Sequence, residues 1–564
     1  MSQLRSVKQA AKNAMKTRFA ITMMLAVALP GAAMTIGPSD SVARSADLPT
    51  FDTAKPDAVL VDGAADAAKR VKLVPSSGQR SDVTVLVRGE DSISKVELVW
   101  NVAFPKDALF YCGAWERTYS NAGWYKMDDK EAPQRGWKPW YFLVNDGERT
   151  DGYGLKVQPS VFGAWKVEPG RVVLSLDLRA GTNPLRLKGR ELGACVLVNR
   201  KGNAGETPFA AAREFCRVMC PKPRLPKSPV YGYNDWYCAY GNNTATNFLA
   251  DAEVFLSCCK GLKNRPYVVV DYGWQRNDFK NTPDDGLWAG VRPKWGMPMD
   301  EVARRVKAMG GKPGIWYRPF WKCRGLPAMP SAEMRDRVKR EMTRFREWGM
   351  ELVKIDFITY DWGCVWGYAM SDTPMCAKNC NWDDSRTTAE VVRDLYTAMR
   401  EGAGDDVIII VCNALDHFAA GLFEQQRTGD DTSGKEWNRT YQFGVNTLGH
   451  RMHHDRTFYA LDGDCIGLVS KGDVPWEKNR LWLDLLANSG TALFVSWKRE
   501  LMDDDVRAAL TEACRKASEV QPVAEPLDWM QCLQPTHWRF GDREKTYDWN
   551  AVRTLGKTGE NHAR

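Results

Sequence analysis

The sequence predicts an α/β fold in which a (β/α)8 TIM barrel follows an N-terminal β-sandwich domain. Alternating apolar runs fill residues 47–220, prolines crowd residues 221–229, and strand-like and helix-like segments alternate through residues 230–519. The chain has 564 residues, of which 44% are hydrophobic and 11% aromatic, so it can bury two or three cores. Residues 520–564 are left for a short C-terminal tail or a truncated β region.

Residues 1–46 are predicted to be a signal peptide and processing region. Basic residues precede an apolar run at 19–33, and small residues at its end and after it offer cleavage sites. Pro30 and Gly31 cut this run short of the roughly 20 apolar residues that span a bilayer, which disfavours the alternative of an uncleaved anchor. We therefore expect an exported protein, periplasmic or extracellular, whose mature form has no membrane segment.

Residues 47–220 are expected to form the β-sandwich because apolar and polar residues alternate with the period of a strand. Val83-Thr-Val-Leu-Val87 and Val96-Glu-Leu-Val-Trp100 are two of these runs, and Gly, Asp and Pro separate them. Residues 221–229 contain four prolines, which cannot enter a helix interior or a central strand. This segment is predicted to be a stiff linker between two domains.

Residues 230–519 contain apolar strands separated by amphipathic stretches, which is the pattern of βα units. Eight strands are predicted, at 230–233, 267–271, 313–317, 352–356, 407–411, 422–427, 458–462 and 492–496. Helices are predicted at 299–309, 331–348, 388–400, 476–487 and 503–519. Eight units close a barrel. An open doubly wound sheet is the alternative, but no G-x-G-x-x-G turn follows the first strand to bind a dinucleotide.

Polar and aromatic residues stand at the carboxyl ends of these strands, where a barrel carries its active site. The candidate catalytic residues are Asp356 and Asp431. The candidate sugar-binding residues are Trp236, Asp235, Asp271, Trp274, Trp316, Arg318, Lys354, Asn413, Arg427 and Asp464. Two carboxyl groups about 5 to 5.5 Å apart can hydrolyse a glycosidic bond with retention. The ends of the fourth and sixth strands are expected to lie close enough across the barrel mouth to supply them.

The surroundings of the two carboxyl groups suggest different roles. Strand alternation places Lys354 and Asp356 on the same side, so the ammonium is expected to hold Asp356 ionised as the nucleophile. Asp430 is expected to raise the pKa of its neighbour Asp431, which suits an acid/base, with Asp430 itself as the alternative. A buried structural ion pair at Lys354 and Asp356, with a helix-capping pair at 430–431, is the competing interpretation.

Other classes of site are disfavoured. Lys and Arg outnumber Asp and Glu by 78 to 70, but they are scattered among the acidic residues, so nucleic acid is not an expected partner. The pair Cys376 and Cys380 and the cluster His450, His453 and His454 each lack a second half at zinc-site spacing, so no metal is predicted. No cofactor is expected, and the sequence carries no signal for an oligomeric state. The 23 Trp residues suit stacking on sugar rings, so an oligo- or polysaccharide is the expected partner.

Five motifs in residues 230–497 resemble, in order, those of the clan D glycoside hydrolases, the α-galactosidases and α-N-acetylgalactosaminidases. They are Gly232-Tyr-Asn-Asp-Trp236, Asp271-Tyr-Gly-Trp274, Lys354-Ile-Asp356, Arg427-Thr-Gly-Asp-Asp431 and Asp462-Gly-Asp464. The resemblance implies retaining enzymes with a K-x-D nucleophile and an R-x-x-x-D acid/base, which are Asp356 and Asp431 here. It also implies that Trp236, Asp271, Lys354 and Arg427 contact the sugar in subsite −1. The N-terminal β domain looks more like family 36 than family 27.

The chain departs from this pattern at two positions that usually bind sugar hydroxyls in clan D. Tyr272 stands where many relatives carry a second Asp, and Asn413 stands where they carry Glu, Ser or a similar group. The short C-terminal region also differs from relatives that end in a complete β-sandwich. Galactose is therefore the family default. The alternatives are an α-N-acetylgalactosaminide, a β-L-arabinopyranoside or an α-glucan, transfer in place of hydrolysis, or a non-catalytic carbohydrate-binding protein.

Overall fold

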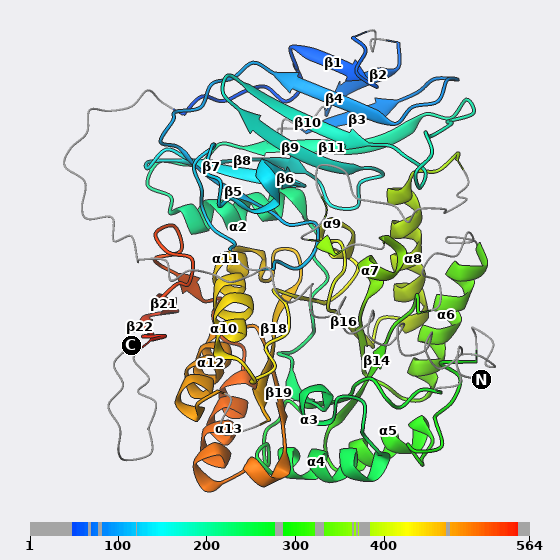
Figure 1. Cartoon of the computed structure of the whole chain (residues 1–564), viewed down its shortest axis with the longest axis vertical. Coiled ribbons are helices and arrows are strands. Elements are labelled where there is room, and N and C mark those ends of the chain that lie inside the picture. Colours follow the sequence, from blue (N-terminus) through cyan, green and yellow to red (C-terminus); the bar gives the residue numbers. More distant parts are fainter. Residues whose placement is uncertain are drawn as a thin grey trace, which may run out of the picture. The chain divides into compact units, whose positions relative to one another are not determined.

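The computed structural model describes residues 48–65, 69–76, 82–119, 121–276, 286–321, 332–363, 366–367, 370, 384–469 and 474–550 (Figure 1). The predicted export region, Cys376, Cys380 and residues 551–564 lie outside these ranges. Within the described ranges, no helix has the length and apolar character needed to cross a membrane.

Two antiparallel sheets form the N-terminal part of the chain, as the alternating runs predict (Figure 1). The first contains, in spatial order, β1 (Ala58–Val61), β4 (Lys95–Trp100), β10 (Arg171–Asp177), β9 (Phe162–Glu168) and β6 (Trp137–Pro139). The second contains β2 (Val71–Pro75), β3 (Val83–Val87), β11 (Leu192–Arg200), β8 (Thr150–Leu155), β7 (Tyr141–Asn145) and β5 (Leu109–Cys112). In β3 the three valines are buried and the residues between them are half-buried, which is the period of a strand with one face in the core.

One helix interrupts the region predicted to be all β. The helix α2 (Pro208–Met219) begins at Thr207, whose side chain accepts a hydrogen bond from the Ala210 N–H, and a proline occupies its first position. Phe215 and Met219 lie on its buried face, which packs against β8 and β11. The signals for this helix are present in the sequence, but it lies between a strand-like run and the proline-rich segment 221–229. Residues 221–229, the predicted linker, contain no helix or strand.

The eight predicted parallel strands form a closed barrel, so the predicted fold class is confirmed. They are β12 (Tyr231–Asn234), β13 (Tyr267–Val270), β14 (Lys312–Tyr317), β15 (Leu352–Ile355), β16 (Ile408–Val411), β17 (Gln425–Arg427), β18 (Ala460–Leu468) and β19 (Ala492–Trp497). Strand β18 is longer than predicted and carries a bulge, because its register with β19 shifts between Asp462 and Cys465.

Helices surround the barrel and fill its connections (Figure 1). The longer ones are α4 (Ala245–Ser257), α5 (Met299–Ala308), α6 (Ala332–Glu347), α8 (Thr388–Ala403), α12 (Trp476–Ser489) and α13 (Asp504–Ala517). Short helical segments are α3 (Trp236–Ala239), α7 (Ile358–Gly363), α9 (Asp416–Ala419), α10 (Trp437–Arg439), α11 (Thr447–Arg451), the π-helix η3 (Thr440–Asn446), and the 3-10 turns η1 (Pro133–Gly136), η4 (Met452–His454) and η5 (Arg499–Leu501). A small sheet of β20 (Glu525–Pro526), β21 (His537–Phe540) and β22 (Arg543–Thr546) occupies the C-terminal region.

Buried polar contacts join the sandwich to the barrel. Tyr141 in β7 hydrogen-bonds the Nε2 atoms of His453 and His454 through its hydroxyl, at 2.8 and 2.6 Å. Burial lowers the pKa of both imidazoles, so they are neutral partners of the phenol. Cys216 lies beside them, and these three residues are the one group within the described ranges with the spacing of metal ligands. Sequence spacing alone did not pair this cysteine with the histidines, since it lies on α2.

A buried ion pair lies at the same junction. Arg451 donates to both carboxylate oxygens of Asp416, at 2.9 and 2.8 Å, and both side chains are almost fully buried. Asp416→Asn is expected to lower the melting temperature, because a buried guanidinium left without its carboxylate costs about 3–5 kcal/mol. Calorimetry would measure the change. Glu512→Gln, which breaks an exposed pair with Arg515, is the control and is expected to leave Tm unchanged. Equal Tm values for Asp416→Asn and wild type would contradict this role.

Candidate active site

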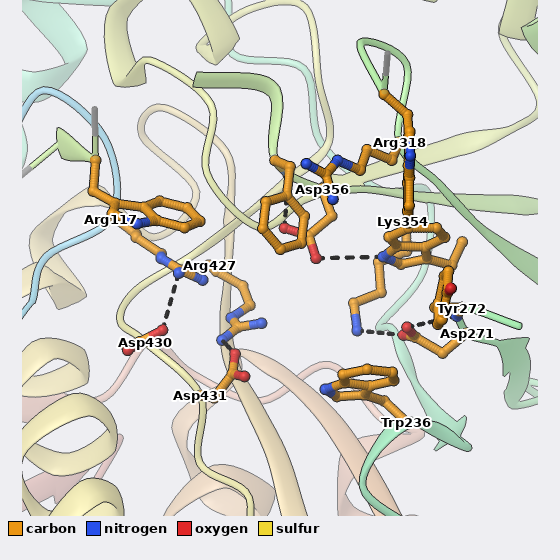
Figure 2. Close-up of a pocket in the computed structure, with 14 residues that line it drawn as sticks. Arg117, Trp236, Asp271, Tyr272, Arg318, Lys354, Asp356, Arg427, Asp430 and Asp431 are labelled. Carbon is orange, nitrogen blue, oxygen red and sulfur yellow. Dashed lines mark hydrogen bonds and ion pairs between the residues drawn. The ribbon is translucent and has the colours of Figure 1, made fainter. Parts of the chain in front are cut away.

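A cavity of about 340 Å³ opens at the carboxyl ends of the barrel strands (Figure 2). Its walls are formed by Arg117, Trp236, Asp271, Tyr272, Trp316, Arg318, Trp321, Lys354, Asp356, Phe357, Trp366, Arg427, Asp430 and Asp431. The volume lies within the range of small-molecule sites, and the lining combines aromatic faces with a few converging charges. Eight of the twelve predicted site residues therefore share one cavity, although they come from five barrel strands and the segments that follow them.

The two candidate catalytic carboxylates are held differently. Asp356 directly follows β15, and its carboxylate accepts hydrogen bonds from the Phe357 N–H at 2.8 Å and the Trp316 indole N–H at 3.3 Å. Asp431 lies in the loop after β17 and accepts a hydrogen bond from Arg427 at 2.8 Å. Phe357 has a φ of +59°, a conformation that a bulky residue adopts only where its surroundings demand it. The residue in this strained conformation directly follows Asp356 and supplies one of its hydrogen bonds.

Lys354 favours the ionised form of Asp356, as expected, but other groups and burial decide the net shift in the pKa of that carboxyl. The Lys354 ammonium donates to the Asp271 carboxylate at 2.7 Å, so its hydrogen bond goes to β13 and not to its neighbour two residues on. Burial removes water from the Asp356 carboxyl and raises its pKa. Three cations, Arg117, Lys354 and Arg427, favour the ionised form, but burial outweighs them. The pKa of Asp356 therefore depends more on its burial than on its position beside Lys354 on one strand.

The expected effect of Asp430 on Asp431 was wrong. Burial raises the pKa of Asp431, but Arg427 and then Arg117 outweigh burial and hold that pKa below its usual value. Asp430 itself forms ion pairs with Arg117 and Arg439, each at 2.9 Å. In the unliganded site Asp431 is therefore the carboxylate, and nearby cations stabilise that form.

Aromatic side chains form one wall of the cavity. Tyr272 stacks on Trp321 with ring centroids 5.6 Å apart and an interplanar angle of 10°, and it meets Trp316 edge-on at 5.5 Å. Trp236 also meets Tyr272 edge-on, with ring centroids 6.2 Å apart. The position where clan D relatives often carry a carboxylate is thus occupied here by a ring within an aromatic cluster. Flat faces of this kind suit the C–H faces of a sugar.

Arg318 is fixed within the same wall. Its guanidinium lies over the rings of Trp321 and Phe357, 4.3 and 4.0 Å from their centroids. Asp361 accepts two hydrogen bonds from it, at 2.7 and 2.6 Å. A planar guanidinium stacked on rings and paired with one carboxylate has little freedom to move, so it offers a preformed donor to a ligand.

Arg117 reaches the cavity from the N-terminal part of the chain and was missed in the sequence. Its loop is tied to the barrel because Thr118 N donates to the Thr428 carbonyl at 2.8 Å and Asp416 N donates to the Trp115 carbonyl at 2.9 Å. Arg117 lies 313 positions before its partner Asp430, and no local pattern marks it as a site residue. Trp321 and Trp366 were missed for the same reason, since they lie in irregular segments.

Four predicted site residues do not line the cavity and instead support those that do. Asp235 accepts from the Asp271 N–H at 2.6 Å, Asn413 accepts from the Ile358 N–H at 3.1 Å, and the Trp274 indole donates to the Trp316 carbonyl at 3.1 Å. Asp464 is buried beside Arg427. Burial raises the pKa of Asp235 to about 7. A sugar in the cavity would not meet these side chains directly.

The fold and the cavity define a barrel of the type found in glycoside hydrolases. No protein-family model and no curated protein sequence matches the chain. Solved structures do match. The α-galactosidase TtGalA from Thermus thermophilus, in complex with p-nitrophenyl α-D-galactopyranoside, aligns with a TM-score of 0.55 at 16% identity, over 85% of this chain and 99% of that chain.

Two further structures are similar. The GH36 α-galactosidase AgaB from Geobacillus stearothermophilus aligns with a TM-score of 0.53 at 12% identity, over 80% of this chain and 66% of its own. A variant of the GH36 α-galactosidase AgaA from the same organism, in complex with raffinose, aligns with a TM-score of 0.53 at 12% identity, over 83% of this chain and 70% of its own. The chain has the fold of the family 36 α-galactosidases, so the resemblance inferred from its motifs is confirmed at the level of the fold.

Proposed function

We propose that the protein is a retaining α-glycosidase of the α-galactosidase type, acting on terminal α-linked galactose in oligo- or polysaccharides. The observation that carries the proposal is that Asp356 and Asp431 face one aromatic-walled cavity at the mouth of the barrel (Figure 2). Retaining hydrolysis needs two such carboxyl groups. The similar structures that contain p-nitrophenyl α-D-galactopyranoside or raffinose support a sugar as the ligand.

In this proposal Asp356 attacks the anomeric carbon and forms a covalent glycosyl-enzyme. The hydrogen bonds from Phe357 and Trp316 aim its carboxylate. Asp431 protonates the departing glycosidic oxygen and then removes a proton from the water that hydrolyses the intermediate. Lys354 and Asp271 are hydrogen-bonded to each other, so between them they offer a donor and an acceptor to sugar hydroxyls.

The charge state of the free site requires one further step. Asp431 is held as a carboxylate by Arg427, yet it must carry a proton when the glycosidic bond breaks. A sugar hydroxyl that accepts a hydrogen bond from Arg427 would weaken its hold on Asp431 and raise the pKa of that carboxyl. We propose that occupation of the cavity brings the acid/base into its working state.

Two positions leave room for other sugars: Tyr272 stands in place of a carboxylate, and Asn413 accepts a hydrogen bond from the Ile358 backbone N–H. An α-N-acetylgalactosaminide, a β-L-arabinopyranoside or an α-glucan would use the same two carboxylates. A non-catalytic carbohydrate-binding protein is the candidate from another class, and the aromatic wall alone would suffice for it.

A panel of p-nitrophenyl glycosides tests both the reaction and the sugar. We expect the α-galactoside to be hydrolysed faster than the α-N-acetylgalactosaminide, β-L-arabinopyranoside and α-glucoside. Proton NMR of the early products is expected to show the α anomer from the α-galactoside, because two displacements at the anomeric carbon restore its configuration. Initial release of the β anomer would make the mechanism inverting. Failure to hydrolyse any member, with binding of a sugar in calorimetry, would identify a carbohydrate-binding protein instead.

A further inference from the structure

Asp464 has an unusual backbone position beside the cavity. It lies in the bulge of β18, where the register with β19 shifts, and its φ is +70°. Positive φ is disfavoured for residues with a side chain, although Asp and Asn tolerate it better than most. Bulges of this kind turn a side chain away from the regular strand direction. The Asp464 side chain is consequently buried next to the end of β17.

Three donors from separate segments converge on this carboxylate. Its Oδ2 atom accepts hydrogen bonds from the Tyr237 hydroxyl in α3 and from the Thr432 N–H at 2.8 Å. Its Oδ1 atom lies 3.4 Å from a guanidinium nitrogen of Arg427, at the end of β17. The Tyr237 N–H in turn donates to the Ser496 hydroxyl at 3.1 Å. Asp464 thus joins β18, β17 and the segment after β12.

Two of these donors flank Asp431. Thr432 is the next residue along the chain, so its hydrogen bond fixes the backbone that carries Asp431. One terminal nitrogen of the Arg427 guanidinium faces Asp464, and the other donates a hydrogen bond to Asp431 at 2.8 Å. The single guanidinium is therefore shared between two carboxylates. The positive charge that Asp431 experiences depends on how much of it Asp464 neutralises.

We propose that Asp464 is a positioning residue for the acid/base: it holds Arg427 and Thr432 in place and weakens the ion pair between Arg427 and Asp431. This inference rests on the proposed function, in which Asp431 protonates the leaving group. The charged and titratable groups that face Asp431 are Arg427, Arg117, Arg439, Asp430, Asp356 and Tyr237. Three of them are arginines, so the loss of one neighbouring carboxylate shifts the balance toward ionised Asp431.

Asp464→Asn tests the inference because Asn also tolerates positive φ and keeps the shape of the side chain. Without the negative charge, Arg427 binds Asp431 alone and stabilises its carboxylate form. Proton donation then becomes harder, and only leaving groups that need a proton are affected. We expect kcat/KM for methyl α-D-galactopyranoside to fall about 10-fold, which is the loss of protonated acid that a pKa shift of about one unit causes, and that for the 2,4-dinitrophenyl glycoside to fall less than about 2-fold.

The pH profile supplies a second readout. Because the acid must be protonated, a lower pKa of Asp431 moves the alkaline limb of kcat for the methyl glycoside to lower pH, by about one unit. Tyr237→Phe is the matched variant, since it removes a donor to Asp464 but leaves the charge. In that variant Asp464 is freer to bind Arg427, so the alkaline limb is expected to stay or to move to higher pH.

The results separate the inference from the proposed function. Equal losses on both glycosides in Asp464→Asn, with an unchanged alkaline limb, would show a merely structural role and overturn the inference. Wild-type protein that hydrolyses neither glycoside would overturn the proposed function itself. Asp464→Gly, whose backbone also accepts positive φ, gives the same two readouts if the Asn variant does not fold.

Discussion

Asp356→Ala is expected to abolish turnover of every glycoside, by at least about 10⁴-fold in kcat. In the proposed mechanism the carboxylate takes part in both half-reactions, because it forms the glycosyl-enzyme and is released from it. An activated leaving group cannot compensate for a missing nucleophile. A fluorogenic α-galactoside would measure the residual rate. Azide added to this variant could attack only the substrate itself, so any glycosyl azide is expected to have the inverted β configuration.

The folding of this variant can be checked independently. The protein around Asp356 raises the pKa of its carboxyl, so the ionised group is disfavoured where it stands. Its removal is therefore expected to leave the melting temperature unchanged or to raise it, as is common for catalytic groups held in unfavourable surroundings. Substantial turnover by a folded Asp356→Ala protein would exclude this residue as the nucleophile.

The architecture of this chain follows closely from local sequence patterns. Buried parallel strands appear as short apolar runs, and the run at 352–356 predicts β15 within one residue. The two departures have physical causes. Helix α2 lies between a strand-like run and the proline-rich linker, and Thr207 with Pro208 is its only clear start signal. Strand β18 continues past the predicted end because the bulge at Asp464 lets pairing with β19 resume.

The positions of the two carboxylates were predictable, whereas the directions in which their pKa values shift were not. Strand ends converge in a barrel, so residues after β15 and β17 meet at its mouth. The pKa of a buried carboxyl depends on which distant groups fold against it. Arg117 arrives from the sandwich, far from Asp431 in the sequence, and Arg439 comes from α10, eight residues after Asp431, where no strand or helix periodicity aims it at that carboxyl. Lys354 lowers the pKa of Asp356 as predicted, although its hydrogen bond goes to Asp271, and burial outweighs its effect.

The N-terminal sandwich contributes a residue, Arg117, to the cavity of the barrel. Arg117 binds Asp430 and contributes to the cation field around Asp431, and its loop is hydrogen-bonded to the barrel on both sides. The barrel carries both candidate catalytic carboxylates, and a residue of the preceding domain changes the pKa of one of them. A barrel expressed alone would lack this cation, so Asp431 would be less strongly ionised in the free site.

Asp431→Ala is expected to fail differently from Asp356→Ala, because the acid/base enters each half-reaction only through proton transfer. Turnover of methyl α-D-galactopyranoside is expected to fall about 10³-fold. With a 2,4-dinitrophenyl glycoside the leaving group departs without a proton, so the glycosyl-enzyme still forms and its hydrolysis limits the rate. Stopped-flow measurement is expected to show a burst of phenol followed by slow turnover. The alkaline limb of the pH profile is expected to flatten, since the ionising acid is gone.

Azide then distinguishes the two roles by stereochemistry. A small anion needs no general base, so it is expected to accelerate turnover of Asp431→Ala by attacking the glycosyl-enzyme held on Asp356. Two displacements give the glycosyl azide of retained α configuration, and proton NMR reads the anomeric coupling directly. If azide instead gave the β product with Asp431→Ala and the α product with Asp356→Ala, the nucleophile and the acid/base would have to be exchanged.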